Sequence, residues 1–209
     1  MDDDYRLTES CEPFGNISEK KQVLMNEIKY AHPRAKDIHK IVSENTGEFK
    51  SKFLKVYCYR CAYCGTSLRI NAKSQFEIDH FIPKTSKRFR SETDAGFIGN
   101  LVLACHTCNH NKSNFELSES SQEILNPDFE KIKKIYYRDN MFYIRVSQDA
   151  SQEAIDFYKK LELGRETCRI DYLLLSMMEL RDKIVNNDSL KCQLNEKIEF
   201  LCLKRNIMT

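Results

Sequence analysis

The sequence predicts an α+β protein, in which a small core with short strands and cysteine knuckles is flanked by mainly helical regions. Two Cys-x-x-Cys pairs, at residues 61/64 and 105/108, enclose two apolar runs of strand length. The chain before this core looks helical, and after it apolar residues recur at the spacing of a helix face. We therefore expect three parts: an N-terminal helical region (1–50), the core (51–118), and a hairpin followed by helices (119–209).

The composition is that of a soluble globular protein. With 209 residues, of which 41% are hydrophobic and 31% charged, the chain is long enough for one domain of ordinary size or two small ones. No apolar run approaches the roughly 20 residues that a membrane-spanning helix needs. The acidic N-terminus lacks the basic and then apolar pattern of a secretion signal. We therefore expect no membrane partner and a cytoplasmic location.

The charge is distributed unevenly along the chain. The net charge is only +2, but residues 52–118 hold ten Lys and Arg against five Asp and Glu, and the flanks are weakly acidic. A basic middle is compatible with a nucleic-acid site confined to that region. A solvated basic face would give the same counts, so charge alone does not decide between the two.

Two helices and one strand are expected up to the first cysteine pair. Residues 18–31 suit a helix with Ser18 as its N-cap, and Pro33 interrupts it. Residues 34–47 suit a second helix that stops near Gly47. Residues 53–65 are rich in aromatic and apolar side chains and end at a glycine, which indicates a strand leading into a knuckle.

The core should contain two strands and a short helix. Residues 76–82 alternate apolar and polar side chains until Pro83, which predicts a strand that carries Asp79 and His80. Residues 83–99 are polar and basic and should form a loop. Residues 100–108 suit a second strand that turns into a knuckle, and a short helix should begin at Asn109.

The C-terminal part should be a hairpin followed by helices. Residues 134–146 suit two strands joined around Asp139 and Asn140. From Ser151 onwards the spacing of apolar residues suits three helices, around residues 155–163, 173–180 and 194–202. We interpret their apolar stripes as core packing or partner contacts. No Gly-rich phosphate-binding loop is present in the sequence.

Nine cysteines, an odd number in a chain without a secretion signal, argue against a disulfide framework. The pairs predict one tetrahedral zinc site, with the ligands Cys61, Cys64, Cys105 and Cys108. Four buried cysteines packed as small apolar groups are the alternative. Cys58 could also pair with Cys61, but the glycine after Cys64 suits a knuckle turn. We expect Cys58 in the core, Cys168, Cys192 and Cys202 in helix packing, and leave Cys11 unassigned.

The adjacent Asp79 and His80 form a useful chemical pair. Neighbouring side chains of a flat strand point to opposite faces, but the twisted end of a strand can bring both to one site. The carboxylate is a hard ligand suited to Mg²⁺ or Mn²⁺. Neutral histidine is a good base near pH 7.

Three segments, IDHFIPK, GNLVLAC and CHTCNHNK, resemble in this order the motifs of the HNH endonuclease family. The resemblance covers residues 56–114 and implies a ββα-metal fold pinned by a four-cysteine Zn²⁺ site. It makes His80 the general base, and Asp79 and Asn109 the ligands of a catalytic Mg²⁺ or Mn²⁺. Asn100 would orient the His80 loop. His110 could supply the third motif position in another register.

The resemblance also implies a nucleic-acid substrate, which we expect to be DNA. Candidate phosphate contacts are Lys84, Lys87, Arg88 and Arg90, although each of these also suits a solvated charge. Lys112 could contact phosphate or serve only the fold. Two competing hypotheses are a non-catalytic zinc module that binds nucleic acid, and an interaction protein whose core has lost activity.

A second resemblance concerns the C-terminal part. The order of EILNPDFE, a hairpin and AIDFYKKLELGRETCR after the core looks like HNH proteins that work with an ATPase in anti-phage systems of the Septu and retron type. It implies an ATPase partner, a role in antiviral defence and a docking function for the helices. The competing hypothesis is a stand-alone nuclease whose flanks complete the core.

Overall fold

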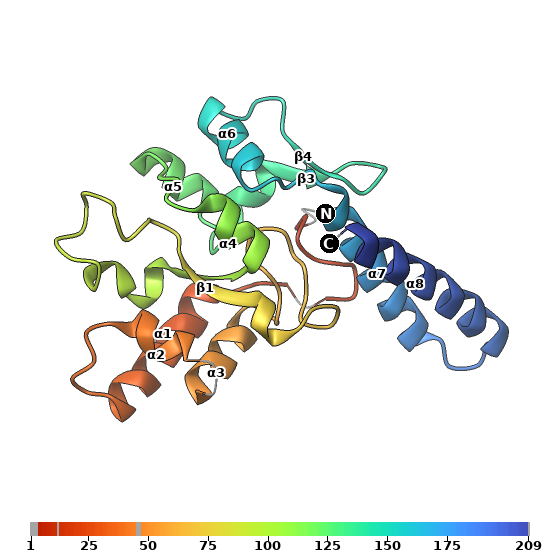
Figure 1. The fold of residues 1–209 in the computed structure, drawn as a ribbon, viewed down its shortest axis with the longest axis horizontal. Helices are drawn as coiled ribbons and strands as arrows, with labels where there is room; N and C mark the ends of the chain where they lie inside the picture. Colours follow the sequence, from red (N-terminus) through yellow and green to blue (C-terminus); the bar gives the residue numbers. More distant parts are fainter. Residues whose placement is uncertain (1–3, 12, 45–46, 209) are drawn as a thin grey trace.

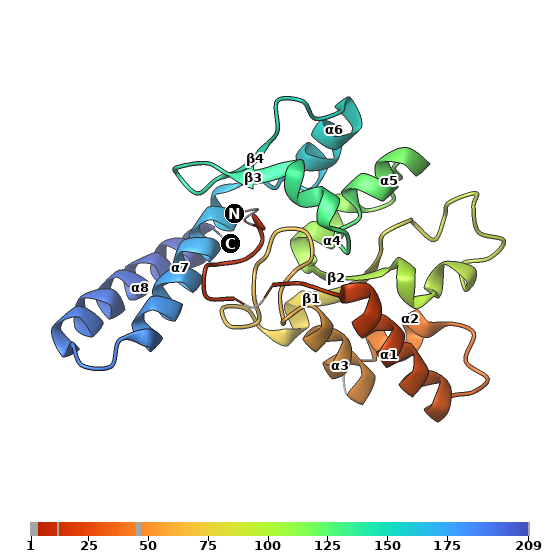
Figure 2. The same cartoon turned by 180° about the vertical axis from the view of Figure 1, so that it is seen from behind.

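The computed structural model describes residues 4–11, 13–44 and 47–208. These residues form a mixed fold of helices and two small antiparallel sheets, which confirms the predicted α+β class (Figure 1). Helices α1 (Ile17–Ala31), α2 (Ile38–Ser43) and α3 (Glu48–Val56) gather on one side of the first sheet, and α4 (His106–Lys112) lies on the other (Figures 1 and 2). None of the helices in the described ranges has the length and apolar character needed to cross a membrane.

The first two helices begin at residues other than those expected. Helix α1 starts at Ile17 behind Asn16, which has a left-handed conformation and makes no side-chain cap, so Ser18 as N-cap is wrong. Helix α2 is shorter than predicted because it begins at Ile38, where the Asp37 side chain accepts a hydrogen bond from the Lys40 amide. Residues 45 and 46, near the expected end of this helix, lie outside the described residues.

The strand expected over residues 53–65 is wrong. Residues 48–56 form helix α3, whose buried side chains are Lys50, Phe53, Leu54 and Val56. The spacing of three and four places these residues on one helix face, and burial of that face outweighs the strand preference of single aromatic and branched side chains. The expected boundary between residues 50 and 51 lies inside this helix, and the division into three parts stays a prediction.

The ββα order of the core is confirmed. Strands β1 (Phe76–His80) and β2 (Leu101–Cys105) pair antiparallel, with His80 opposite Leu101 and Phe76 opposite Cys105. Helix α4 follows β2 at once and begins at His106, three residues earlier than predicted. The predicted loop between the strands contains only two single 3₁₀ turns, η2 (Asp94–Gly96) and η3 (Ile98–Asn100).

The C-terminal part begins with a helix that the sequence did not predict, α5 (Glu119–Leu125), capped by Ser118. A 3₁₀ helix, η4 (Glu130–Lys134), leads into the expected hairpin of β3 (Tyr136–Arg138) and β4 (Ile144–Val146). The expected helices follow as α6 (Gln152–Lys160), α7 (Glu166–Lys183) and α8 (Asp188–Met208). Helices α7 and α8 project from the end of the molecule away from α1 and α2 (Figure 1).

The main hydrophobic cluster joins segments from all parts of the chain, from Tyr5 to Cys168. A smaller cluster of Ile170, Leu174 and Ile198 lies between α7 and α8. The positions of the core residues therefore depend on the flanking regions as well as on the core itself.

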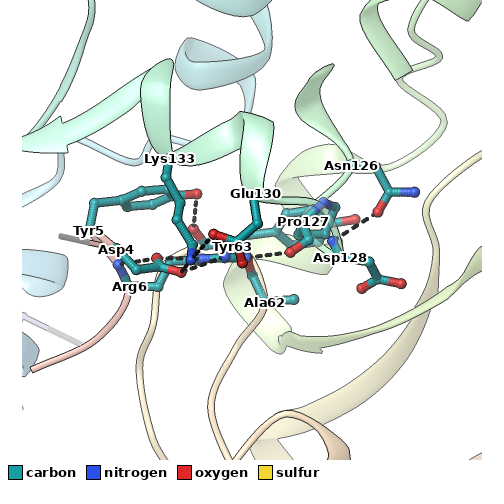
Figure 3. Close-up of polar contacts among 10 residues, drawn as sticks. All are labelled: Asp4, Tyr5, Arg6, Ala62, Tyr63, Asn126, Pro127, Asp128, Glu130 and Lys133. Atoms are coloured by element: carbon teal, nitrogen blue, oxygen red, sulfur yellow. Dashed lines mark hydrogen bonds and ion pairs between the residues drawn. The ribbon is translucent and has the colours of Figure 1, made fainter. Parts of the chain in front are cut away.

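The N-terminal segment is bound to the core by a buried polar network (Figure 3). Arg6 is 2% exposed; it pairs with Asp4 at 2.7 Å and donates to the carbonyl oxygens of Ala62 (3.0 Å) and Pro127 (2.7 Å). The backbone here also approaches Gly65, which has a φ of 80°, so closely that a Cβ on this glycine would lie 2.1 Å from the Arg6 carbonyl oxygen. Gly65 is thus required by the knuckle turn and by the segment lying over it.

Candidate functional site

The four predicted cysteine ligands converge. The sulfur atoms of Cys61, Cys64, Cys105 and Cys108 all lie within 4.8 Å of one another, and all four side chains are buried. The first pair lies in a turn closed by the bridge between Arg60 and Ser67, and the second lies where β2 passes into α4. Four thiolates around one centre fit Zn²⁺. Cys58 does not belong to the group and packs against the main cluster, as predicted.

The thiols of the cysteine group differ in how readily they ionise: hydrogen bonds among them and burial raise the pKa values of Cys105 and Cys108 well above the usual range. Hydrogen bonds with neighbouring thiols, that of Cys105 first, hold the pKa of Cys64 well below its usual range. The Arg165 guanidinium lies 3.6 Å from the Cys108 sulfur and comes from the N-cap position of α7. Cys168, predicted to pack between helices, is buried beside Cys64. Helix α7 therefore contributes to the environment of this metal site.

Strand β1 buries Asp79 between two donors. The Tyr63 hydroxyl donates to Oδ2 at 2.6 Å, and the Lys112 ammonium donates to Oδ1 at 3.2 Å. Burial raises the pKa of Asp79, although Lys112 and Tyr63 act in the opposite direction. A carboxylate can accept about four hydrogen bonds. The two donors therefore fix the orientation of Asp79 and still leave lone pairs free to bind a cation.

His80 follows at the end of the strand and is half-buried. Burial, together with the neighbouring His39, lowers the pKa of His80 to about 4. The imidazole is therefore neutral at pH 7, and the neutral form is the one that can accept a proton. The ring of His39, a residue of α2, lies against it with 4.3 Å between ring centroids.

Asn109 reaches the same region from α4. Its amide nitrogen donates to the carboxylate of Glu77, which also contacts Nδ1 of His106 at 2.8 Å. Burial opposes ionisation of Glu77, but the contacts with His106 and Asn109 outweigh it and keep the pKa of Glu77 below its usual value. Among the described residues nothing donates to the amide oxygen of Asn109, so this oxygen is available as a ligand.

A cavity of about 640 Å³ collects these groups. Its lining includes Glu77, Asp79, His80 and Asn109 from the ββα core, His39 from α2, and Lys84 from the loop. His110 is exposed and does not line this cavity; its ring stacks near that of His106, with centroids 6.0 Å apart. Of the two alternatives for the third motif position, Asn109 is thus the one that lines the cavity together with His80.

Asn100 lies behind the cavity and binds the chain that follows His80. Its side chain accepts from the Ile82 amide at 2.8 Å and donates to the Ile82 and Ala95 carbonyls at 2.9 and 3.0 Å. Its own carbonyl accepts from the Phe81 amide at 2.8 Å. With 2% exposure it is out of reach of a substrate. This position suits the expected orienting role, which stays a prediction.

The basic residues occupy different environments. Lys84 lines the cavity and contacts Glu92 at 3.0 Å, whereas Arg88 pairs with Glu119 at 2.6 Å. Lys87 and Arg90 are exposed. Lys112 is 1% exposed and donates to Asp79 and to the His80 carbonyl, which favours the alternative that it serves the fold over a phosphate contact.

Among the cavity residues that sequence reasoning missed, Glu77 and His39 lie in contact with predicted site residues. Glu77 precedes Asp79 by two positions on one strand, and the period of two could have identified it as a neighbour on the same face. His39 lies outside the motif and had no visible partner. No local signal identifies it, because its contact with His80 depends on how α2 packs against β1.

Comparisons with known proteins agree with this geometry. Residues 61–115 match the family model described as HNH endonuclease, a range that contains the four cysteines, both strands and α4. The searches of curated proteins and of solved structures gave no match.

Proposed function

We propose that this protein is a metal-dependent endonuclease that hydrolyses phosphodiester bonds in DNA, because residues 61–115 match the HNH endonuclease family model. The observation that carries the proposal is the meeting, in one cavity, of a neutral His80 with the oxygen donors of Asp79 and Asn109. A zinc site alone requires none of these three residues. Their convergence therefore favours a nuclease over a zinc module that only binds nucleic acid.

The donor atoms fit two kinds of metal. Four buried thiolates suit a structural Zn²⁺, and the carboxylate of Asp79 with the amide oxygen of Asn109 suits Mg²⁺ or Mn²⁺. Glu77 adds a further carboxylate at the same cavity. Tyr63 and Lys112 orient Asp79 from behind, as outer hydrogen-bond partners of ligating carboxylates do.

In the proposed mechanism His80 removes a proton from the attacking water. Burial keeps its imidazole neutral, and the Lys112 bond to its carbonyl at 2.8 Å fixes its backbone. A divalent cation held by Asp79 and Asn109 would supply charge neutralisation at the scissile phosphate and the leaving oxygen. Lys84, at the wall of the cavity, is placed to contact a phosphate next to the scissile one.

The first experiment is cleavage of supercoiled plasmid with Mg²⁺ or Mn²⁺ by the wild type and by His80→Ala. We expect nicking or linearisation by the wild type only, because loss of a general base costs about 10²–10⁴-fold in rate. His110→Ala is the matched control and should retain activity, since His110 is outside the cavity. Zinc content and melting temperature should be the same in all three proteins.

Each other outcome has a distinct meaning. Cleavage by His80→Ala at the wild-type rate would refute the role of His80. A zinc-loaded wild type that binds DNA but cuts neither DNA nor RNA with either cation would favour the binding module. Cleavage of RNA alone would change the substrate and keep the mechanism.

The ATPase partner and the defence role rest on the weaker sequence resemblance alone, and the comparisons give them no support. They stay predictions. Stimulation of cleavage by an ATPase encoded beside the gene would support them, and equal cleavage with and without that protein would count against them.

A further inference from the structure

The cavity of the proposed active site is completed by a side chain from outside the HNH match. We infer that His39 is a positioning residue, which holds the imidazole of His80 in one orientation by stacking against it. This inference rests on the proposed function of His80 as the general base. It assigns a catalytic purpose to the N-terminal helical region, which supplies His39 through α2.

His39 is itself fixed to the strand that carries His80. Its Nε2 lies 2.9 Å from the carbonyl oxygen of Ile78, which can only accept, so Nε2 carries a proton and donates. Helix α2 is held in place by the buried side chains of Ile38 and Val42 and by the Asp37 cap. The ring of His39 is therefore a rigid surface against which His80 can pack.

The His80 ring depends on this contact for its orientation. Its centroid lies 4.3 Å from that of His39, with 33° between the ring planes. No hydrogen bond to the His80 imidazole is found among the described residues. A half-buried imidazole without such a bond can rotate about its last side-chain torsion, and rotation moves the basic nitrogen away from the water. A stacked neighbour removes this freedom before the substrate arrives.

The loop between the strands packs against the beginning of α2. A Cβ on Gly96 would lie 2.5 Å from the Asp37 Oδ1 atom and 3.5 Å from the His39 Cβ. The loop backbone thus packs directly on the beginning of α2, and it can do so because Gly96 has no side chain. His39 is half-buried at the wall of the cavity, with β1, His80 and this loop against it, and these contacts suit a support for another side chain.

The kinetic test compares His39→Ala, His39→Phe and the control His32→Ala on a labelled DNA duplex with Mn²⁺. His32 is an exposed histidine of the same region whose ring contacts Phe49 instead. We expect His39→Ala to lower kcat by roughly 10- to 100-fold with KM changed less than about twofold, the size of effect known for outer supporting residues. His39→Phe keeps a ring against His80 and should recover most of kcat. His32→Ala should behave as the wild type.

Two kinetic outcomes would overturn the inference. A rise in KM with unchanged kcat would make His39 a substrate contact. Equal losses in His39→Ala and His39→Phe would mean that stacking is not what His39 contributes. A wild type that never cleaves would overturn the proposed function first, and the catalytic purpose of His39 with it.

A second measurement, by NMR, detects the contact between the His39 and His80 rings and does not depend on enzyme activity. The chain has five histidines, so the ring-proton NMR signals can be assigned by single substitutions. Stacking shifts the His80 ring signals through the ring current of its neighbour. We expect these signals to move and broaden in His39→Ala, to move little in His39→Phe, and to stay in place in His32→Ala. His80 signals unchanged in His39→Ala would refute the contact in solution, whatever the kinetics show.

Discussion

At the scale of single residues, the interior charges of this protein occur as pairs. Asp79 with Lys112, Asp4 with Arg6, and Lys21 with Asp128 are each buried together. A buried pair adds little net stability, but removal of one member leaves the other charge without compensation. Lys112 shows this arrangement next to strand β1.

We predict that Lys112→Met destabilises the protein by about 3–5 kcal/mol, because it leaves the Asp79 carboxylate unpaired and the His80 carbonyl without its donor. Urea unfolding measures the change. The double variant Lys112→Met/Asp79→Asn should recover a large part of the loss, since no buried charge remains. An exposed control, Lys87→Met, should stay within about 0.5 kcal/mol of the wild type. Equal stability of Lys112→Met and Lys87→Met would contradict the pairing.

At the scale of elements, the two knuckles connect the sheet to α4. Cys105 ends β2 and Cys108 lies in the first turn of the helix, so the metal site fixes the angle at which Asn109 enters the cavity. Structural zinc binding is coupled to folding. The metal should therefore control the geometry of the candidate site as well as the stability of the protein.

Single cysteine substitutions test this coupling. Cys61→Ser and Cys105→Ser should lose zinc and melt at a clearly lower temperature, because each removes a ligand from the group. Cys58→Ser should keep its zinc, since Cys58 is outside the group although it has the same spacing from Cys61. Metal analysis and thermal melting check both statements. If Cys61→Ser kept its zinc and Cys58→Ser lost it, Cys58 would be the zinc ligand and Cys61 the packing residue.

Much of the arrangement of elements follows from local pattern. Alternation predicted β1, the turn residues at 139 and 140 predicted the hairpin of β3 and β4, and helical spacing predicted α6 to α8. Helix α3 was mistaken for a strand because its aromatic content was weighted over the spacing of Phe53 and Leu54. Helix α5 is short and polar, and only its Ser118 cap and tertiary contacts identify it.

The candidate site could be predicted only where motifs carry it. The spacing of the two cysteine pairs predicted that all four cysteines share one site, and the structure confirms that grouping. The burial of Lys112 and the contact of His39 with His80 could not be predicted from the sequence. Both arise from packing between segments that are distant in the sequence. The catalytic roles themselves remain predictions until they are measured.

At the scale of the whole molecule, the flanks and the core share their polar contacts. Tyr57 donates to Asp128 at 2.6 Å, Arg6 donates to the Ala62 carbonyl at 3.0 Å, and Arg138 donates to the Tyr5 carbonyl at 2.7 Å. Segments from before and after the core thus meet over the first knuckle, as the close view of Arg6 shows (Figure 3). Such contacts favour a single cooperative unit.

We predict that a fragment of residues 51–118 does not fold stably on its own. It would lack the partners of Tyr57 and Cys108, which lie at Asp128 and Arg165, and it would expose much of the main cluster. The full chain should unfold in one transition followed equally by circular dichroism and by zinc release. A fragment that binds zinc and melts cooperatively near the full-length temperature would make the core an independent domain.

The two cysteine pairs stand at the ends of a 40-residue insertion that holds both strands and the basic loop. In polymer terms, the metal site closes a ring, and the entropy of closing a flexible ring grows only with the logarithm of its length. A doubling in length costs about 0.6 kcal/mol. Residues added between Arg90 and Ser91, which are both exposed, would therefore change stability little. The loop between Lys84 and Glu92, which both line the cavity, can thus change in length at little cost in stability.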